Sequence, residues 1–143
     1  MNSESADFKY GTASLEQDLP ANDKIADMKR AIYNKVKYHL EKEKVYLDPK
    51  LSLVRFSSIV GTNTTYLSGT INSCFGCNLK TLVNRFRIEH AKRLLLDEQE
   101  YDIKEIPRMC GFASRSAFYS SFQRVENTTP LDYLAKNKPY QKQ

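Results

Sequence analysis

The fold is indicated by residues 52–72, SLVRFSSIVGTNTTYLSGTIN. Ser52 can cap a short helix whose apolar residues are Leu53, Phe56, Ile59 and Val60. Gly61 follows, and glycine accepts the left-handed conformation that ends a helix at little cost. A second short helix then runs from Thr64 to Asn72, with capping residues before it. The stretch predicts two helices joined by a sharp turn, with the second helix protruding.

A second copy of this pattern follows 50 residues later, as DIKEIPRMCGFASRSAFYSSFQR, residues 102–124. Asp102 can cap a helix that carries Ile103, Ile106, Met109 and Cys110, and Glu105 completes a capping box. Gly111 ends this helix, and another follows from Arg115 to Arg124. One such pair is common in small helical domains. Two pairs in register are a much stronger indication of two helix-turn-helix units.

A helix from about Leu79 to Leu96, capped by Asn78, is predicted between the two units. Its apolar positions form two clusters, about 140° apart at about 100° per residue: Leu79, Leu82, Val83 and Phe86, then Ile88, Ala91, Leu94 and Leu95. We therefore expect a linker helix that contributes to two cores. At 1.5 Å per residue it spans about 27 Å, which compares with roughly 34 Å for one DNA turn. An ordinary long helix in one bundle is the alternative.

The first part of the chain is predicted to hold an arm and a helix. Residues 1–21 are polar and acidic, which is typical of a flexible arm. A helix begins at Asn22 or Asp23 and continues to about residue 44, with an apolar stripe of Ile25, Met28, Ile32, Val36 and Leu40. No stretch alternates as a strand does, so the fold class is all-α. The expected order is an arm (1–21), an N-terminal helix (22–48), the first helix-turn-helix (49–78), the linker helix (79–97), the second helix-turn-helix (98–136) and a tail (137–143).

The charge is unevenly distributed along the chain. Residues 1–23 carry a net charge of −4, whereas the remaining 120 residues hold 21 Lys and Arg against 12 Asp and Glu, a net charge of +9. A basic body favours a polyanionic partner, because phosphate contacts supply most sequence-independent affinity for DNA. The alternative is that the excess lysines only solvate a helical surface.

The residues favour no catalytic or metal chemistry. Cys74 and Cys77 form a CxxC motif, but the only other cysteine is Cys110, so the second pair that a zinc site needs is missing. His39 and His90 fall among charged residues on helices, and no nucleophile elbow or phosphate-binding glycine loop occurs. We expect no enzyme activity, no catalytic residue, no metal and no cofactor.

Location is predicted from the cysteines and the apolar runs. Three cysteines, an odd number, favour a reducing compartment over a disulfide framework. The longest apolar run is Leu94–Leu96, far below the roughly 20 residues of a spanning helix, and the N-terminus lacks a signal peptide pattern. We expect a cytoplasmic, nucleoid-associated protein that makes no membrane contact.

Several motifs resemble the AraC/XylS transcription regulators. RFRIEHAKRLL, residues 85–95, resembles the linker-helix signature of that family. The second helix-turn-helix of the family is matched by Ile103–Ile106, Cys110–Phe112, Phe118, Phe122, Thr129–Pro130 and Tyr133, and the first by Tyr66–Ser68 and Phe75–Cys77. The resemblance covers about residues 50–136. It implies a transcription regulator with a bipartite DNA-binding domain whose two recognition helices enter successive major-groove segments.

The resemblance also implies which residues face DNA. The groove-facing set is Thr64, Thr65, Ser68, Gly69 and Asn72 in the first unit, and Arg115, Ser116, Tyr119, Ser120 and Gln123 in the second. Helical spacing agrees, because Leu67 and Phe118 would face inward. Threonine methyls suit thymine, Asn and Gln suit adenine, and Arg suits guanine. The expected phosphate contacts are Thr62, Asn63, Arg85, Arg87 and Arg124.

The sequence departs from the family pattern at several positions. Arg is frequent in the family where Gly69 and Ser120 stand, and Thr64–Asn72 holds no Lys or Arg. Pro107 replaces a small residue and predicts a kinked helix. Weak base readout by the first unit is therefore expected, with DNA shape and phosphate contacts contributing more. The alternative function is a helical protein-interaction module that has lost strong base readout. The implied partners are double-stranded DNA, RNA polymerase, and a sensor domain or dimer partner outside this chain.

Overall fold

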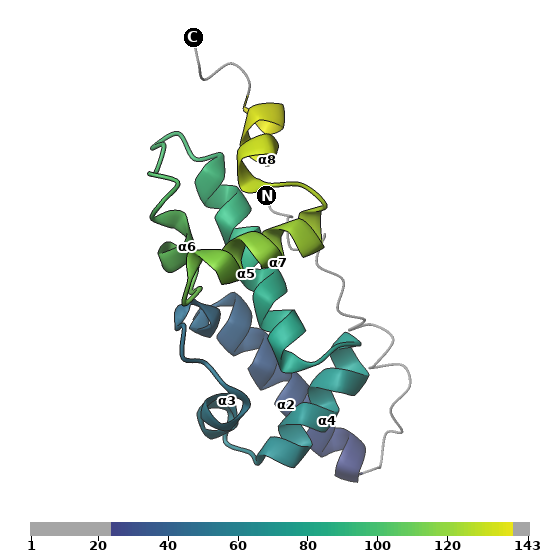
Figure 1. The fold of residues 1–143 in the computed structure, drawn as a ribbon. Coiled ribbons are helices and arrows are strands. Elements are labelled where there is room, and N and C mark those ends of the chain that lie inside the picture. Colours follow the sequence, from purple (N-terminus) through teal and green to yellow (C-terminus); the bar gives the residue numbers. More distant parts are fainter. Residues whose placement is uncertain (1–23, 139–143) are drawn as a thin grey trace. The chain divides into compact units, whose positions relative to one another are not determined.

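The computed structural model describes residues 24–138, and every element within that range is helical (Figure 1). The helices are α2 (Lys24–Glu41), the short 3-10 helix η2 (Val45–Leu47), α3 (Leu53–Val60), α4 (Thr64–Phe75), α5 (Leu79–Leu95), α6 (Ile106–Met109), α7 (Arg115–Glu126) and α8 (Pro130–Asn137). The all-α fold class is confirmed. The expected arm, residues 1–21, lies outside the described residues. None of the helices between residues 24 and 138 has the length and apolar character needed to cross a membrane.

The chain divides into two compact units. Unit 1 contains residues up to Val45 and Leu51–Val83, and unit 2 contains Tyr46–Lys50 and the chain from Asn84 onward. The boundary between Val83 and Asn84 falls inside α5, as expected of a helix that contributes to two cores. The segment 46–50 is the exception to chain order, since it belongs to unit 2 but precedes α3.

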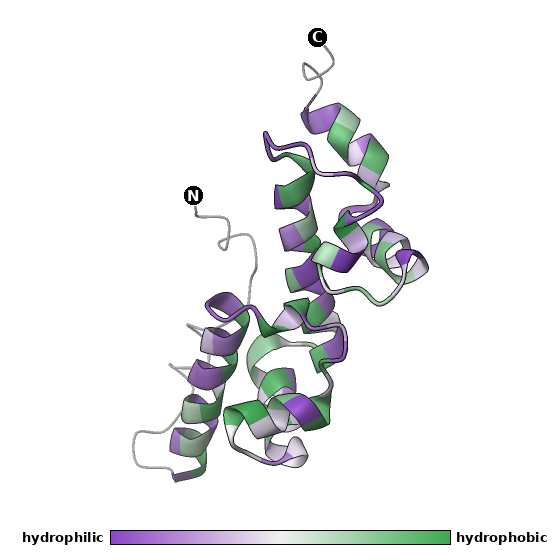
Figure 2. Ribbon diagram, turned by 90° about the vertical axis from the view of Figure 1, so that its left-hand side faces the viewer, coloured by the Kyte–Doolittle hydropathy of each residue, from purple (hydrophilic) through white to green (hydrophobic). Residues whose placement is uncertain are grey.

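Unit 1 is built from α2, α3 and α4. The hydrophobic positions of α2 face the other helices of the unit (Figure 2). Its buried members include Ile32, Tyr33, Val36 and Leu40, and the Tyr33 and Phe75 ring centroids lie 5.3 Å apart. Helix α2 ends at Glu41, earlier than expected, and Lys44 takes a left-handed φ of 54° before η2.

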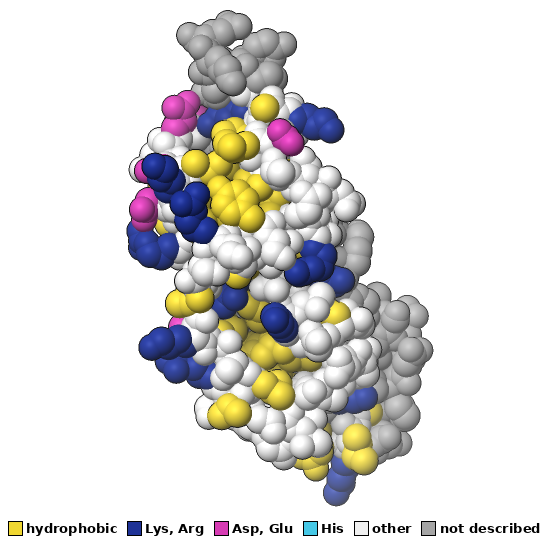
Figure 3. Space-filling view, viewed as in Figure 1, with side chains coloured by type: hydrophobic (Ala, Val, Ile, Leu, Met, Phe, Trp, Pro, Cys, Tyr) yellow, Lys and Arg dark blue, Asp and Glu magenta, His cyan; other side chains and the backbone are white. Residues whose placement is uncertain are grey.

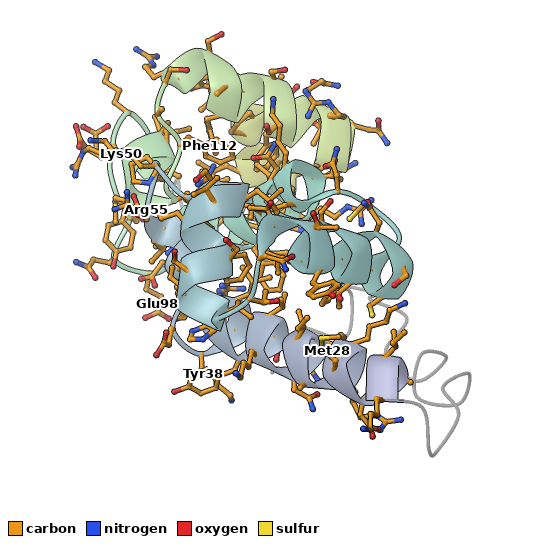
Figure 4. All side chains as sticks on the ribbon, turned by 90° about the horizontal axis from the view of Figure 1, so that it is seen from below. Met28, Tyr38, Lys50, Arg55, Glu98 and Phe112 are labelled. Atoms are coloured by element: carbon orange, nitrogen blue, oxygen red, sulfur yellow. The ribbon has the colours of Figure 1, made fainter. Side chains whose placement is uncertain are left out.

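The predicted stripe on α2 is wrong in its first turns. Ile25 is 68% exposed and Met28 is 38% exposed, whereas Ala26 and Tyr33 are buried. Ala26 and Tyr33 lie about 100° around the helix from Ile25 and Ile32, at about 100° per residue. The buried face is therefore turned toward Tyr33, which leaves Ile25 and Met28 at its edge. Tyr38, which is 52% exposed, projects from α2 away from α3 and α4 (Figure 4).

Unit 2 has its own core, formed where the second half of α5 meets α6 and α7. Its buried residues are Ile88, Ala91, Leu95, Ile106, Cys110, Phe112, Phe118 and Phe122. The Phe118 ring centroid lies 5.5 Å from that of Phe112 and 5.8 Å from that of Phe122, which lies 5.7 Å from that of Tyr133 on α8. Phe86 was expected to join the first cluster of α5. Instead its ring centroid lies 5.5 Å from that of Tyr46, so it packs within unit 2.

Helix α6 begins later than predicted. It covers only Ile106–Met109, with Pro107 in its first turn, instead of starting after Asp102. A helix starting at Ile103 would need an N–H on residue 107, which proline lacks. The predicted capping box is also absent, because the Glu105 carboxylate pairs with Arg108 and the Asp102 carboxylate accepts from the Lys104 N–H at 3.0 Å.

Candidate nucleic-acid interface

Local hydrogen bonds fix the first helix-turn-helix as the sequence predicts. The Ser52 hydroxyl accepts from the Arg55 N–H at 3.1 Å and caps α3. Gly61 ends α3 with a left-handed φ of 86°, and its N–H donates to the Ser57 carbonyl at 2.8 Å. Asn63 then caps α4, because its Oδ1 accepts from the Tyr66 N–H at 2.8 Å. The direction in which α4 leaves the turn is therefore set by short-range contacts.

The second helix-turn-helix is fixed in the same way. The Ser114 hydroxyl accepts from the Ala117 N–H at 3.1 Å and caps α7. The Thr129 hydroxyl accepts from the Asp132 N–H at 3.1 Å and caps α8, with Pro130 in the first helical turn. Lys92 on α5 donates to Glu89 at 3.1 Å and to Glu126 at the end of α7 at 3.0 Å. Burial lowers the pKa of Lys92, but these two carboxylates outweigh it, so the pKa is raised.

Helices α4 and α7 correspond residue by residue at an offset of 51. Each has 12 residues and an Asn or Ser N-cap. The inward-facing pairs are Leu67 with Phe118, Thr70 with Ser121, and Ile71 with Phe122, all buried. Gly76 and Asn127 end the two helices in left-handed conformations. The glycines that follow α3 and α6, Gly61 and Gly111, are 50 residues apart. The offset of α4 and α7 is 51 because the turn after Gly111 is one residue longer than the turn after Gly61.

The outward face of α4 carries most of the residues predicted for it. Thr65, Gly69 and Asn72 are exposed, while Thr64 and Ser68 are half-buried. The sequence interpretation missed Tyr66, which is 49% exposed and lies one helical turn before Gly69. The helical spacing that selected Gly69 also places residue 66 beside this face, so that signal was available. The resulting surface of α4 is polar and contains no charged side chain.

The outward face of α7 carries two guanidinium groups. Arg115, Ser116, Ser120 and Gln123 are exposed. Tyr119 is half-buried, because its ring packs edge-on against Phe118 with centroids 5.3 Å apart. One predicted phosphate contact, Arg124, is exposed and donates to the Ser120 hydroxyl at 3.2 Å, which directs it along this same face.

The other predicted phosphate contacts lie in different surroundings. Asn63 is exposed, and its amide nitrogen stays available because the N-cap uses only Oδ1. Thr62 and Arg85 are half-buried. Each therefore presents part of its side chain to solvent. Arg87, by contrast, is buried.

Arg87 is buried in unit 2, which corrects its expected role. Only 9% of the residue is exposed, its Nε donates to the Tyr46 carbonyl at 2.7 Å, and an Nη donates to the Asp48 carbonyl at 2.9 Å. The guanidinium carbon lies 5.6 Å from the centre of the Phe112 ring. Burial lowers the pKa of Arg87, partly offset by the nearby Asp48 carboxylate. Arg87 thus holds segment 46–50 in unit 2 and cannot reach a phosphate.

The thiols of Cys74 and Cys110 are buried. Burial raises the pKa of the Cys110 thiol to about 12, and burial also raises that of Cys74. Such thiols are protonated near neutral pH, so they lack the thiolate that metal binding and redox chemistry use. Within residues 24–138, no group of three or more His, Cys, Asp or Glu side chains is arranged to hold a metal ion.

Two capped helix-turn-helix units, each with a polar outward face on its second helix, define the class of bipartite helix-turn-helix domains. A family model described as a helix-turn-helix domain matches residues 56–136. The chain belongs to this AraC/XylS-type helix-turn-helix family.

Individual relatives agree with this assignment. The chain is 28% identical over 102 residues to the probable transcriptional regulator LumQ of Photobacterium leiognathi, covering 71% of this chain and 38% of that protein. It is 31% identical over 78 residues to the xylose operon regulatory protein of Escherichia coli, covering 54% of this chain and 20% of that protein. The chain therefore matches well under half the length of these relatives.

A solved structure shows the same fold. The DNA-binding domain of AdpA, a global transcriptional factor crystallised with a target DNA, superposes with a TM-score of 0.66. The match covers 79% of this chain and 97% of that domain, at 20% sequence identity. The likeness extends over both units of the fold.

Proposed function

We propose that this chain is a sequence-specific double-stranded DNA-binding transcription regulator, in which α4 and α7 read two adjacent major-groove segments. The observation that carries the proposal is the correspondence of α4 and α7, which have the same length, a side-chain N-cap each and three matching buried positions, and whose outward faces are mostly exposed. An α-helix fits the major groove of B-DNA, where all four base pairs can be distinguished. Acting at the nucleoid, such a domain would position or block RNA polymerase.

Charge supports this proposal. Residues 24–143 hold a net charge of +9. Three of the proposed phosphate or base contacts are arginines at the surface: Arg115 and Arg124 are exposed and Arg85 is half-buried. Such groups supply the salt-dependent, sequence-independent part of affinity for DNA. The hydroxyls and amides on α4 and α7 would then select among sequences.

The test measures binding to a selected duplex and to a random duplex over a range of salt concentrations. We expect a steep loss of affinity with added salt on both duplexes and a preference for the selected one. Arg115→Ala should weaken binding to the selected duplex by about tenfold or more and change binding to the random duplex far less. Lys136→Ala removes the same charge from the exposed surface of α8 and is the matched control. Equal weakening of both duplexes by Arg115→Ala would show that Arg115 contacts only phosphate.

A second candidate function is that of a helical protein-interaction module. The uncharged face of α4 favours it, and so does a hollow of about 560 Å³ in unit 2, lined by Leu95, Tyr101, Leu131 and Leu134. Figure 3 shows hydrophobic side chains gathered there, between α8 and the loop after α5. Leu131 is 58% exposed at this hollow, and its apolar surface would be covered by a partner protein that binds there. This function would be favoured if the chain lacked the salt-dependent, sequence-preferring binding to DNA that the first function predicts.

A further inference from the structure

The outward faces of α4 and α7 differ in charge at two corresponding positions. Helix α4 contains no Lys, Arg, Asp or Glu. At the offset of 51, Arg115 corresponds to Thr64 and Arg124 corresponds to Ser73. The two guanidinium groups of α7 are thus replaced by hydroxyl groups in α4, although the two helices share three matching buried positions.

Gly69 adds a gap to the middle of this uncharged face. At about 100° per residue, Gly69 lies between Thr65 and Asn72 on one side and Tyr66 and Ser73 on the other. A Cβ built on Gly69 meets no atom within 4 Å, and its φ is outside the left-handed region. The fold therefore does not require glycine at position 69. Glycine inside a helix costs about 1 kcal/mol relative to alanine, so its presence here is not explained by helix stability.

These side chains suit A·T base pairs better than G·C base pairs. Recognition of guanine N7 and O6 uses a pair of strong donors, most often from Arg, and α4 has none. Asn72 can pair with adenine N6 and N7, and the Thr65 methyl can contact the thymine methyl. The gap at Gly69 leaves room for that methyl and lets the helix backbone approach the groove floor. Helix α7 offers the opposite chemistry, since Arg115 is exposed.

We propose that unit 1 reads a half-site of A·T base pairs without a guanine contact, whereas unit 2 reads a half-site containing a guanine bound by Arg115. This inference rests on the proposed function and deepens it by assigning a base composition to each half of the DNA site. Specificity is therefore divided between the units: methyl and adenine contacts in one, a guanidinium–guanine contact in the other.

The experiment selects bound sequences from a random duplex pool with the full chain, then repeats the selection with reciprocal variants. The Arg115→Thr variant should lose the guanine from one half, which identifies that half as the one read by unit 2. The Thr64→Arg variant, which gives α4 the side chain of its counterpart, should introduce a guanine into the other half. Each change should alter affinity for the original and new duplexes by about tenfold to a hundredfold.

Thr64 is half-buried, so the Thr64→Arg variant could misfold, and a second variant at an exposed position is needed. Asn72→Ala changes an exposed residue and should relax an adenine preference in the unit 1 half alone. Enrichment of guanine in both halves with the unmodified chain would overturn the inference, as would an unchanged unit 1 half in Asn72→Ala. Failure to enrich any sequence would instead overturn the proposed function, so the two failures are distinguishable.

Discussion

At the scale of single residues, Gly111 has the most crowded surroundings of the glycines that the structure describes. Its φ of 93° is left-handed, and a Cβ there would overlap the Tyr46 carbonyl oxygen and lie 2.9 Å from the Leu47 Cα. Both obstacles are backbone atoms, which cannot rotate away. They belong to the segment that Arg87 holds by its two hydrogen bonds. Segment 46–50 therefore lies against Gly111 and is hydrogen-bonded by Arg87.

Gly111→Ala should lower the free energy of unfolding by about 2–4 kcal/mol, because it combines left-handed strain with backbone overlap. Gly61→Ala is the matched control. Gly61 has a φ of 86°, but a Cβ there meets nothing within 4 Å, so only the strain of about 1 kcal/mol applies. Urea denaturation measures both. Equal losses in the two variants would show that the contact with segment 46–50 adds nothing.

Cys110 should make stability depend on alkaline pH. Burial raises its pKa from 9.0 to about 12, so the unfolded chain loses this proton at a lower pH than the folded chain does. The free energy of unfolding should therefore be unaffected below about pH 9 and fall as the pH rises toward 12, by at most about 1.4 kcal/mol per pH unit. Cys110→Ala should show a smaller slope in denaturation curves from pH 8 to 11. Asn72→Ala, which removes no titratable group, is the control and should keep the original slope. Identical slopes in all three proteins would contradict the prediction.

At the scale of elements, helices with side-chain caps were predictable, since their signals are local. Ser52, Asn63, Asn78 and Ser114 each accept the backbone hydrogen bond that their type suggests, and α3, α4, α5 and α7 begin directly after them. Helix α6 starts later than its apolar spacing indicates, because Pro107 lacks the N–H that an earlier start needs. The α2 stripe failed in the first turns because burial there depends on which side faces α3 and α4.

The candidate site was predictable to the same extent. The outward faces of α4 and α7 follow from the inward Leu67, Ile71, Phe118 and Phe122, which are all fully buried. Arg87 could not be assigned in this way. Its acceptors are two backbone carbonyls about 40 positions earlier in the chain, and every residue type offers such a carbonyl. Only the folded arrangement distinguishes Arg87 from the partly exposed Arg85.

Gly69→Ala should stabilise α4. Its surroundings are open and its backbone is helical, so the substitution gains helix propensity without a clash. We expect the free energy of unfolding to rise by about 0.5–1 kcal/mol. Thermal denaturation followed by circular dichroism checks this, with Ser73→Ala, at another exposed position of α4, as the comparison. A loss of stability in Gly69→Ala would mean that the Cβ meets an obstacle.

At the scale of the whole molecule, the acidic N-terminal residues and the basic remainder should have opposite effects on binding to DNA. Residues 1–21 hold four acidic side chains and Lys9, so removing them raises the formal net charge from +5 to +8. Deletion should strengthen binding to a random duplex several-fold at low salt and leave the melting temperature unchanged. This gain in affinity should vanish at high salt, because added ions screen the repulsion between the acidic side chains of residues 1–21 and the DNA phosphates.

A full-length variant separates charge from chain length in that experiment. It carries Glu4→Gln, Asp7→Asn, Glu16→Gln and Asp18→Asn, which remove the acidic charges and keep every residue in place. It should reproduce the stronger binding of the deletion. Weaker binding in either protein would indicate that residues 1–21 contribute directly to the complex. A lower melting temperature in the deletion would show that these residues support the fold.

The insertion of residues 46–50 into unit 2 has a consequence for the order in which the chain is made. A ribosome synthesises these residues about 40 positions before Arg87 and about 60 before Gly111. Segment 46–50 therefore cannot make its contacts in unit 2 until after α3 and α4 have been synthesised. Unit 2 is consequently not a contiguous piece of the gene. A fragment that starts at residue 51 or later leaves the Arg87 guanidinium buried without its carbonyl acceptors, so any dissection of the molecule has to keep residues 46–50 with the C-terminal half.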